Sequence, residues 1–410
     1  MHLTLHLTAR CNFRCGYCYA APHTGGTMTA DTVRAAIDLG LRLSAKESPE
    51  QSLGVVFFGG EPLLCPDLIR LAIHHCREVE SRTGQRFHFK VTTNGSLLDE
   101  EFLTDPLTSE VFVALSHDGV QAAHDMHRLD SEGKGTFERL LPAIERLLKH
   151  RPYAPVMLVT TPETVQWYAD SVRFLFTRGF RYIICSLNYG RPWSERSLRT
   201  LAQQYDALSD WYEKQTEREE KFYFSPFDVK IASHVFTGSC RRERCELGRR
   251  QLSVAPDGRI FPCVQFVANG EDSEWCIGDV RSGVDEVKRQ RIYEANAMQK
   301  EECSECAIRA RCNHFCGCLN RQATGRIDAV APILCAHEQM VLQVADRLAE
   351  RLFRKKAPMF VQKQYNELFP LVSLAEDHVA LSTGKSTHRE GQQSTALPPA
   401  PRTGASEGAR

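Results

Sequence analysis

Three cysteines stand close together near the start of the chain. Cys11, Cys15 and Cys18 have the spacing Cys-x3-Cys-x2-Cys and follow residues 2–8, whose alternating pattern predicts a β-strand. Structural zinc sites and ordinary electron-transfer clusters are closed by four protein ligands. A loop with three thiols therefore indicates an iron–sulfur cluster with one iron open to another molecule. Two alternatives are a zinc site completed by a histidine such as His23 and core thiols that bind no metal.

A second cysteine group lies in the C-terminal half of the chain. Cys303, Cys306, Cys312 and Cys316 have the spacing Cys-x2-Cys-x5-Cys-x3-Cys. The cysteines around this group are Cys240, Cys245, Cys263 and Cys335. Residues 254–261 contain a Pro-Asp-Gly turn and predict a hairpin that brings Cys263 back toward Cys245. Such a group binds clusters or forms a zinc ribbon, since zinc knuckles use similar spacings.

Small or polar residues end three successive segments that we predict to be strands. Gly59-Gly60-Glu61-Pro62 follows residues 55–58, Thr93-Asn94-Gly95 follows residues 87–92, and Ser116-His117-Asp118-Gly119 follows residues 111–115. Ligands of parallel α/β folds bind at the carboxyl ends of the strands. Although each turn is ordinary when taken singly, their order predicts one shared site.

The elements that must position these residues alternate along the chain. Further strands are predicted at residues 155–160 and 182–187, and helices at 29–44, 66–83 and 136–150. This alternation is typical of parallel βα units. A helix at residues 198–221 leads to the cysteine-rich region, and an amphipathic helix at 338–354 is expected to pack back on the first part of the chain.

Together these residues resemble the radical S-adenosylmethionine (radical SAM) superfamily, whose hallmark is the Cys-x3-Cys-x-aromatic-Cys loop of Cys11, Cys15, Tyr17 and Cys18. The resemblance covers residues 1 to about 200. It implies an α/β fold, a partial (β/α)6 TIM-like barrel with a C-terminal cysteine-rich SPASM domain. It also implies that the open iron chelates S-adenosyl-L-methionine, and that the reduced cluster cleaves this molecule to a 5'-deoxyadenosyl radical that abstracts hydrogen.

The resemblance also implies roles for single residues. Gly59, Gly60 and Glu61 are expected to hold the methionyl ammonium, Ser116 the ribose, and the backbone at Tyr17 the adenine. Arg128, twelve residues after Ser116, resembles the arginine that binds the methionyl carboxylate, and Asn94 is a weaker candidate for this pocket. His117 departs from the family pattern, which has an aliphatic residue there.

The second cysteine group resembles the SPASM extension, which binds two auxiliary four-iron clusters. The resemblance assigns to the first auxiliary cluster Cys240, Cys245, Cys263 and Cys316, and to the second Cys303, Cys306, Cys312 and Cys335. With the cluster of the first loop, the chain is expected to carry three 4Fe-4S clusters. Cys318 could replace Cys316 as a ligand, and the sequence leaves this choice open. The cysteines expected to be buried without metal are Cys65, Cys76 and Cys185.

The expected domains follow from these patterns and the resemblance. They are a radical SAM barrel at 1–197, a bridging helical region at 198–234, a SPASM domain at 235–340, a helical region at 341–380, and a disordered tail at 381–410. The tail is rich in Ser, Thr, Gly, Gln and Pro and has few large apolar residues.

Charge and composition restrict the partners and the location. Lys plus Arg equals Asp plus Glu, at 51 each, so no overall field favours nucleic acid or an anionic membrane. No signal peptide and no membrane-spanning apolar run is apparent, so we expect a reducing cytoplasm. The expected partners are a peptide or protein substrate and an electron donor such as flavodoxin or ferredoxin. Since the first strand starts at residue 2, leader recognition is expected from another chain or from the SPASM region.

The resemblance predicts a SPASM-type enzyme that modifies a peptide or protein side chain, for example by a thioether or other crosslink in a ribosomally made peptide. Sulfatase-maturing relatives carry an aspartate base directly after the cysteine that matches Cys263, whereas this chain has Val264 followed by Gln265. We therefore assign no side-chain base. Formylglycine formation in sulfatases and a small-molecule substrate such as a porphyrin are the alternatives. A simple electron carrier would have no need of Glu61 or Arg128.

Overall fold

The computed structural model describes residues 1–20, 23, 25–47, 52–236, 246–267 and 274–382. Two predicted cluster ligands, Cys240 and Cys245, lie outside these residues. Of the predicted tail, residues 383–410 also lie outside them.

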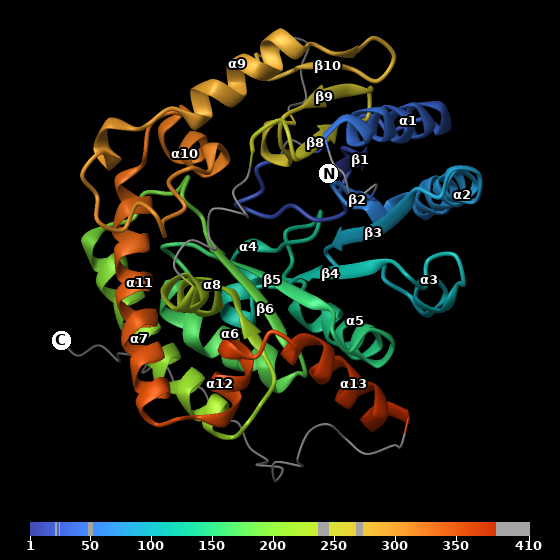
Figure 1. The fold of residues 1–410 in the computed structure, drawn as a ribbon. Helices are drawn as coiled ribbons and strands as arrows, with labels where there is room; N and C mark the ends of the chain where they lie inside the picture. The colour runs from blue at the N-terminus through green and yellow to red at the C-terminus, as the bar shows by residue number, and fades with distance from the viewer. Residues whose placement is uncertain (21–22, 24, 48–51, 237–245, 268–273, 383–410) are drawn as a thin grey trace, which may run out of the picture.

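A parallel sheet forms the centre of the protein (Figure 1). In sequence order its strands are β1 (His2–Thr8), β2 (Ser52–Gly59), β3 (Arg86–Thr93), β4 (Phe112–Ser116), β5 (Pro155–Thr160), β6 (Tyr182–Leu187) and β7 (Tyr223–Phe224). Consecutive strands are neighbours and run parallel throughout. The predicted partial barrel is confirmed, and β7 adds a short strand beyond the six that we predicted.

Helices cover the outer face of this sheet. They are α1 (Ala30–Glu47), α2 (Pro66–Thr83), α3 (Glu100–Thr104), α4 (Gln121–His127), α5 (Phe137–His150), α6 (Tyr168–Thr177) and α7 (Glu195–Glu217). On β3, Phe87 and Phe89 are buried, and Arg77 of α2 lies 5.2 Å from the centre of the Phe89 ring. Alternate side chains such as Lys90 point to the opposite, inner face and remain partly exposed. The main core therefore lies between the sheet and its helices.

The cysteine-rich region continues the same sheet. Strand β8 (Gln251–Val254) pairs with β1 in parallel, and β9 (Arg259–Phe261) returns antiparallel to β8. Gly258 has a φ of +95° in the turn, and the Asp257 side chain accepts a hydrogen bond of 3.1 Å from Arg259 N, so the predicted hairpin is confirmed. The short strands β10 (Gly278–Asp279) and β11 (Gly283–Val284) complete an eleven-stranded sheet.

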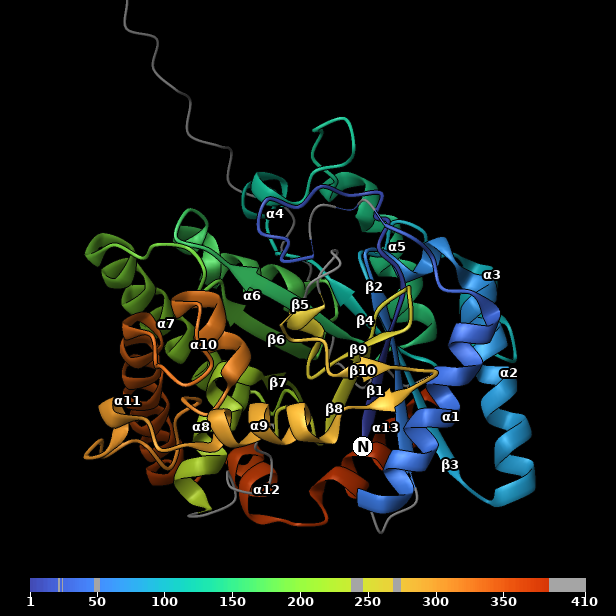
Figure 2. The ribbon, with the colours of Figure 1, turned by 90° about the horizontal axis from the view of Figure 1, so that it is seen from above.

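Most of the remaining helices lie along one side of the barrel, and the last of them runs along the bottom of the molecule in the view of Figure 1 (Figures 1 and 2). They are α8 (Ser225–Val235), α9 (Glu286–Ala297), α10 (Gly317–Thr324), α11 (Pro332–Arg354), α12 (Pro358–Tyr365) and α13 (Phe369–Ser382). Helix α11 packs against α7 and α8, the helices that follow the last long barrel strand, whereas we predicted that residues 338–354 pack on the barrel itself. It begins earlier than predicted, because Pro332 occupies the first turn, where a missing N–H is tolerated. Cys335 consequently lies on this helix.

The sheet does not stop at the expected domain boundary. Because β8 extends the barrel sheet beyond β1, the cysteine-rich region and the barrel share one set of backbone hydrogen bonds. The division at residues 197, 234, 340 and 380 stays a prediction. No helix in the described ranges is long and apolar enough to cross a membrane.

A buried ion pair joins α8 to α11. Lys230 Nζ lies 2.6 Å from Glu338 Oε2, and both side chains are almost fully buried. Lys230 also donates to the carbonyl of Arg311, and Asn313 donates to Glu338. The pair therefore fixes the segment around Cys312 between the two helices.

Breaking this pair from one side should destabilise the protein. Lys230→Met leaves Glu338 as an uncompensated buried charge, for which the expected loss is about 3–5 kcal/mol of unfolding free energy. The double variant Lys230→Met/Glu338→Leu should lose clearly less than the sum of the single variants. Urea unfolding of all four proteins measures both quantities, and additive losses would contradict a direct interaction.

Candidate functional site

The loop that carries Cys11, Cys15 and Cys18 crosses the carboxyl ends of the strands. Arg14 N donates to Leu129 O at 2.7 Å, and Gly16 N donates to His127 O at 2.9 Å. The Arg191 guanidinium, which follows β6, donates to Gly16 O at 2.9 Å. The loop is thus fixed from the α4 side and from the β6 side.

The three thiols of this loop are partly exposed and form no disulfide. Cys11 and Cys15 each interact electrostatically with Cys18. Burial raises the pKa of both Cys11 and Cys15 to about 11, so in the metal-free protein they hold their protons at neutral pH. Metal binding must displace those protons, as is usual for thiolate ligands.

Gly59 and Gly60 allow β2 to run directly against the end of β1. Gly59 has a φ of +128°, and a Cβ on Gly60 would lie 2.1 Å from the carbonyl oxygen of Arg10. Gly60 N donates to Thr8 O at 2.8 Å, and Glu61 N donates to Arg10 O at 2.9 Å. No larger residue fits here without moving the start of the cysteine loop.

The Glu61 carboxylate is buried and only 1% exposed. It accepts hydrogen bonds from Leu63 N at 3.0 Å, Thr93 Oγ1 at 2.7 Å and Asn94 N at 2.8 Å. Burial raises its pKa to about 7, although these three donors oppose the shift. Among the described residues no cation pairs with it, so a bound ammonium group would supply a charge that the site lacks.

The Asn94 side chain joins the end of β3 to the cysteine loop. Its Nδ2 donates to Asn12 Oδ1 at 2.9 Å and lies 3.9 Å from Cys11 Sγ. Its Oδ1 accepts from Ser96. Asn94 therefore lies at the predicted site, but its polar atoms are already engaged by protein groups.

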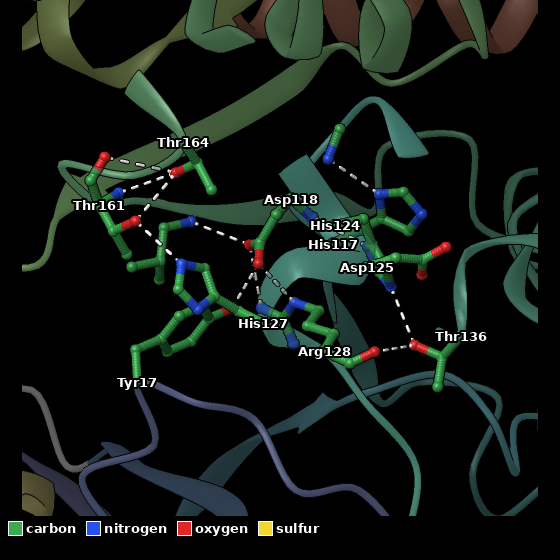
Figure 3. A network of polar contacts seen from close by, with 12 residues as sticks. Tyr17, His117, Asp118, His124, Asp125, His127, Arg128, Thr136, Thr161 and Thr164 are labelled. Atoms are coloured by element: carbon green, nitrogen blue, oxygen red, sulfur yellow. Dashed lines mark hydrogen bonds and ion pairs between the residues drawn. The ribbon is translucent and has the colours of Figure 1, made fainter. Parts of the chain in front are cut away.

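Asp118 is the centre of the polar network that Figure 3 shows. It accepts from Tyr17 Oη at 2.6 Å, from Arg128 Nε at 2.9 Å and Nη2 at 3.2 Å, and from Val159 N at 3.1 Å. Arg128 is only 5% exposed, and its guanidinium lies 5.5 Å from the centre of the Tyr17 ring. One carboxylate thus connects the cysteine loop, β4, β5 and the end of α4.

The structure brings the predicted residue Ser116 to the same strand edge, at the end of β4 and partly exposed. Within the described part of the chain its hydroxyl has no hydrogen-bond partner. The next residue, His117, is fully buried, and its Nδ1 accepts from Gly119 N at 3.1 Å (Figure 3). His117 therefore stabilises the turn that aims Asp118, which explains a polar residue at this position.

Asp118 is not among the residues for which the sequence predicted a role. Its only sequence signal was the Asp-Gly pair after Ser116 and His117, which is also an ordinary turn signature. His127 was missed as well. Its Nε2 lies 2.9 Å from Thr161 Oγ1, and its ring packs edge-on against Tyr17 at 5.3 Å. Contacts of this kind between distant segments carry no local sequence pattern.

The second cysteine group separates into two sets in space. Cys335 interacts electrostatically with Cys303 and Cys306, and Cys312 with Cys335. These four are the residues that we predicted for one cluster. Lys300 is 4% exposed, and its charge interacts with both Cys303 of this set and Cys316 of the other.

The other set consists of Cys263, Cys316 and Cys318. Cys318 Sγ lies 2.9 Å from Cys263 Sγ, and it also contacts Cys316. The hydrogen bond from Cys318 and the N–H groups at the start of α10 lower the pKa of Cys316 to about 7, against the effect of burial. Of the leftover cysteines, Cys76 is buried as predicted, while Cys65 and Cys185 are partly exposed.

Within the described ranges no three His, Cys, Asp or Glu side chains converge tightly enough to hold a single metal ion. In a four-iron cluster each thiolate binds its own iron, so its ligands stand farther apart than those of a mononuclear zinc site. All the donors in these sets are thiols. They therefore fit iron–sulfur clusters better than the zinc site completed by a histidine that we considered for Cys11, Cys15 and Cys18.

Two family models match this chain. Residues 5–175 match the model described as the radical SAM superfamily, and residues 245–313 match SPASM, an iron–sulfur cluster-binding domain. The chain belongs to the radical SAM superfamily. It is a radical SAM enzyme of the SPASM type, and its cofactors are S-adenosylmethionine, the radical SAM cluster and auxiliary iron–sulfur clusters.

Relatives of this radical SAM enzyme include proteins of several activities. It is 28% identical over 182 residues to uncharacterized protein MJ0907 of Methanocaldococcus jannaschii, an alignment that spans 44% of this chain and 60% of that protein. It is 20% identical over 338 residues to the cysteine-type anaerobic sulfatase-maturating enzyme of Clostridium perfringens strain 13, spanning 75% and 85%. It is 24% identical over 277 residues to the antilisterial bacteriocin subtilosin biosynthesis protein AlbA of Bacillus subtilis, spanning 65% and 55%.

Solved structures share the fold. The structure of anSMEcpe with bound AdoMet superposes with a TM-score of 0.71 at 19% identity, covering 86% of this chain and 99% of that chain. Streptococcus suis SuiB bound to the precursor peptide SuiA gives a TM-score of 0.54 at 14% identity, covering 82% and 75%. At such identities these superpositions establish the architecture and leave the substrate to be argued from the site.

The raised pKa of Glu61 predicts a pH dependence of stability. The folded chain binds a proton at Glu61 up to pH of about 7, whereas the unfolded chain releases it near the ordinary value of 4.5. The unfolding free energy should therefore fall as the pH rises through this range, by about 3 kcal/mol in total.

Anaerobic urea unfolding at pH 5 and pH 8 measures this effect. Glu61→Gln cannot ionise, so its free energy of unfolding should lack this contribution, even though the lost hydrogen bonds destabilise it at every pH. The matched control Thr93→Val removes one donor and keeps the carboxylate, and it should retain the dependence. Parallel pH profiles for the wild type and Glu61→Gln would show that Glu61 does not titrate in this range.

Proposed function

We propose that this enzyme modifies a side chain of a peptide or protein, forming a thioether or other crosslink in a ribosomally made peptide. The observation that carries the proposal is Val264, which stands directly after Cys263, where sulfatase-maturing relatives have their aspartate. Its backbone N–H faces the Cys263 sulfur, as does the side-chain amide of Gln251 at 3.3 Å. Neither a valine side chain nor an amide nitrogen can accept a proton.

The relatives support a peptide substrate. AlbA is described as a bacteriocin biosynthesis protein, and SuiB was solved with a precursor peptide. A thiol of such a substrate could lose its proton on binding an auxiliary iron, since metal coordination deprotonates thiols. A thioether link then requires no protein carboxylate.

Sulfatase maturation is the second candidate, and the comparison of folds favours it. The TM-score to anSMEcpe exceeds that to SuiB, 0.71 against 0.54, and sulfatase-maturating relatives align over 75% of this chain. Formylglycine formation requires a proton to be taken from the substrate thiol or hydroxyl. A positioned base typically contributes about 10²- to 10⁴-fold to such a step. The missing carboxylate therefore outweighs the shared architecture.

We propose the predicted residues as the S-adenosylmethionine pocket. When bound, S-adenosylmethionine and the cluster supply a 5'-deoxyadenosyl radical. Glu61 provides a buried carboxylate without a cationic partner among the described residues, suited to the methionyl ammonium beside Gly59 and Gly60. The Ser116 hydroxyl, which has no hydrogen-bond partner among the described residues, would hold the ribose, and the Tyr17 backbone lies in the loop itself.

Arg128 is proposed to bind the methionyl carboxylate. Asp118 engages its Nε and Nη2, which leaves Nη1 without a hydrogen bond to the described residues. Asp118 is thereby a positioning residue, because it orients the guanidinium and holds Tyr17 at the same time. Asn94 would act as a positioning residue, because its side chain holds Asn12 and thereby the cysteine loop.

Removing Arg128 should weaken S-adenosylmethionine binding. Loss of one charge-assisted contact costs about 1.5–3 kcal/mol, or about 10- to 150-fold in affinity. Because Arg128→Ala alone leaves Asp118 buried and unpaired, the variant to measure is Arg128→Ala/Asp118→Asn, with Tyr17→Phe as a control that loses one hydrogen bond only. Calorimetric titration of the reconstituted proteins gives the affinities. An unchanged affinity in the double variant, with its iron content intact, would remove Arg128 from the pocket.

Mass spectrometry after turnover tests the chemistry. A short peptide encoded beside this enzyme should lose two hydrogens, and one of its thiols should become resistant to alkylation. A sulfatase-type peptide with Cys or Ser at the target position should remain unchanged. Efficient formation of formylglycine in that peptide would overturn the proposal in favour of sulfatase maturation.

The remaining expectations stay predictions. They concern a flavodoxin or ferredoxin as electron donor, a leader-binding partner chain, the absence of nucleic-acid and membrane partners, and a cytoplasmic location. The assignment of Cys240, Cys245, Cys263 and Cys316 to one auxiliary cluster, and of Cys303, Cys306, Cys312 and Cys335 to the other, is likewise a proposal.

A further inference from the structure

Strand β1 carries a histidine on the face of the sheet that the helices do not cover. Leu3 lies against Gly40 of α1, so Leu5 shares the helix-covered face and His6 points to the opposite, inner face of the barrel. His6 is paired in register with Phe58 of β2, and the centres of the two rings are 5.3 Å apart. Only 4% of His6 is exposed. A titratable group is therefore buried inside the barrel, on the strand that leads into the cysteine loop.

The His6 ring lacks the partners that a buried histidine usually has. Its Nε2 is fully enclosed and forms no hydrogen bond with the described residues. The buried ring of His337, by contrast, is paired at both nitrogens, with Tyr189 and Tyr205 at 2.7 Å each. Burial lowers the pKa of His6 to about 3, so the ring is neutral at neutral pH and has one donor and one acceptor nitrogen. An unpaired buried polar group costs stability, which packing alone does not explain.

The neighbouring strand β8 places a second group of this kind beside His6. Ser253 is fully buried, and its hydroxyl makes no hydrogen bond within the described ranges. It is paired in register with Thr4, whereas Leu252 before it is paired with Leu3 on the helix-covered face. Ser253 therefore shares the inner face with His6 and is its diagonal neighbour across the two strands. Two buried polar groups without partners in the described chain thus lie on one face of adjacent strands.

This pair lies between the two ends of the enzyme's machinery. Strand β1 continues from His6 into the loop that begins at Cys11, and on β8 the side chain of Gln251, two residues before Ser253, donates to Cys263 Sγ at 3.3 Å. The inner face around the pair is accessible, because side chains of β2 and β3 that point the same way are partly exposed, namely Val56, Phe58, Lys90 and Thr92. A substrate that reaches from the cysteine loop toward the auxiliary cysteines would pass both groups.

We propose that His6 and Ser253 form a substrate subsite that binds a backbone amide of the peptide substrate. A neutral imidazole and a hydroxyl can each donate and accept a hydrogen bond, which matches the C=O and N–H of an amide. Neither residue carries a charge, so a charged group would lose its hydration here without a counter-charge from the pair. The edge of the Phe58 contact adds an apolar wall. The inference rests on the proposed peptide substrate, and it assigns that substrate a binding site beyond the S-adenosylmethionine pocket.

Peptide kinetics of the reconstituted holoenzyme test the subsite. The probes are the short peptide encoded beside this enzyme and the sulfatase-type peptide, and the measurement uses the one that the wild type converts. His6→Leu and Ser253→Ala should each raise the KM for that peptide about 5- to 150-fold, because a buried amide loses a hydrogen-bond partner, while kcat stays nearly unchanged. His6→Gln keeps a donor and an acceptor and should recover most of the loss. Iron content and the affinity for S-adenosylmethionine should equal those of the wild type in all three variants.

The outcomes separate this subsite from the proposed function. Conversion of the sulfatase-type peptide would overturn the proposed crosslinking, and the same variants would still test the subsite on that peptide. An unchanged KM in both His6→Leu and Ser253→Ala would overturn the subsite alone. A wild type that converted neither peptide would overturn the peptide substrate and the subsite together.

A stability measurement distinguishes a subsite from a structural role. Ser44 provides the matched control, since it is 1% exposed on α1 and its hydroxyl donates to Ser52 O at 3.3 Å. Ser44→Ala should lower the urea midpoint and leave the KM unchanged. Ser253→Ala removes a hydroxyl without a partner among the described residues, so its midpoint should stay equal or rise. A midpoint that falls as in Ser44→Ala, together with an unchanged KM, would show that bound water or the protein itself satisfies this hydroxyl, and would overturn the proposal.

Discussion

The Asp118 carboxylate connects the cysteine loop to two other segments at the carboxyl ends of the strands. It bonds to Tyr17 in the cysteine loop, to Arg128 after α4 and to the backbone of β5. A buried carboxylate is stable only when it is paired and fully hydrogen-bonded, and Asp118 satisfies this through three segments at once. Removing the donor of any one segment leaves the buried carboxylate with fewer partners, which also destabilises its contacts with the other two segments. The loop geometry is therefore coupled to the packing of the barrel.

Glu61 shows the opposite arrangement at the same edge of the sheet. Its carboxylate is as deeply buried as that of Asp118, but its partners are the neutral donors of Leu63, Thr93 and Asn94, so no cation among the described residues compensates its charge. The protein itself thus supplies the cationic partner of Asp118, whereas Glu61 has none among the described residues and can accept a cation from a ligand. This contrast between neighbouring strand ends supports the proposal that Glu61 would hold the methionyl ammonium and Arg128 the methionyl carboxylate.

The sequence predicted the elements better than the contacts between them. The strands at residues 2–8, 155–160 and 182–187 and the helix at 66–83 match the structure, because alternation and capping are local signals. The roles of Asp118 and His127 were not predictable, since each depends on a residue that is distant in the chain. The start of α11 was missed by six positions, because residues 332–337 contain no clear amphipathic repeat. The contact between Cys318 and Cys263 was likewise not predictable, because the two residues are 55 positions apart in the chain.

The attachment of the cysteine-rich region explains how two cluster sites can be held in fixed relation. Strand β8 lies directly beside β1, and the cysteine loop begins where β1 ends. Tyr19, just after Cys18, interacts electrostatically with Cys18 as well as with Cys263 and Cys318. The sheet therefore places the first auxiliary set next to the radical SAM loop, and the Lys230–Glu338 pair anchors the second set through α11. The shared backbone hydrogen bonds between β1 and β8 thus fix the position of the cysteine-rich region relative to the strand ends, which a flexible tether could not provide.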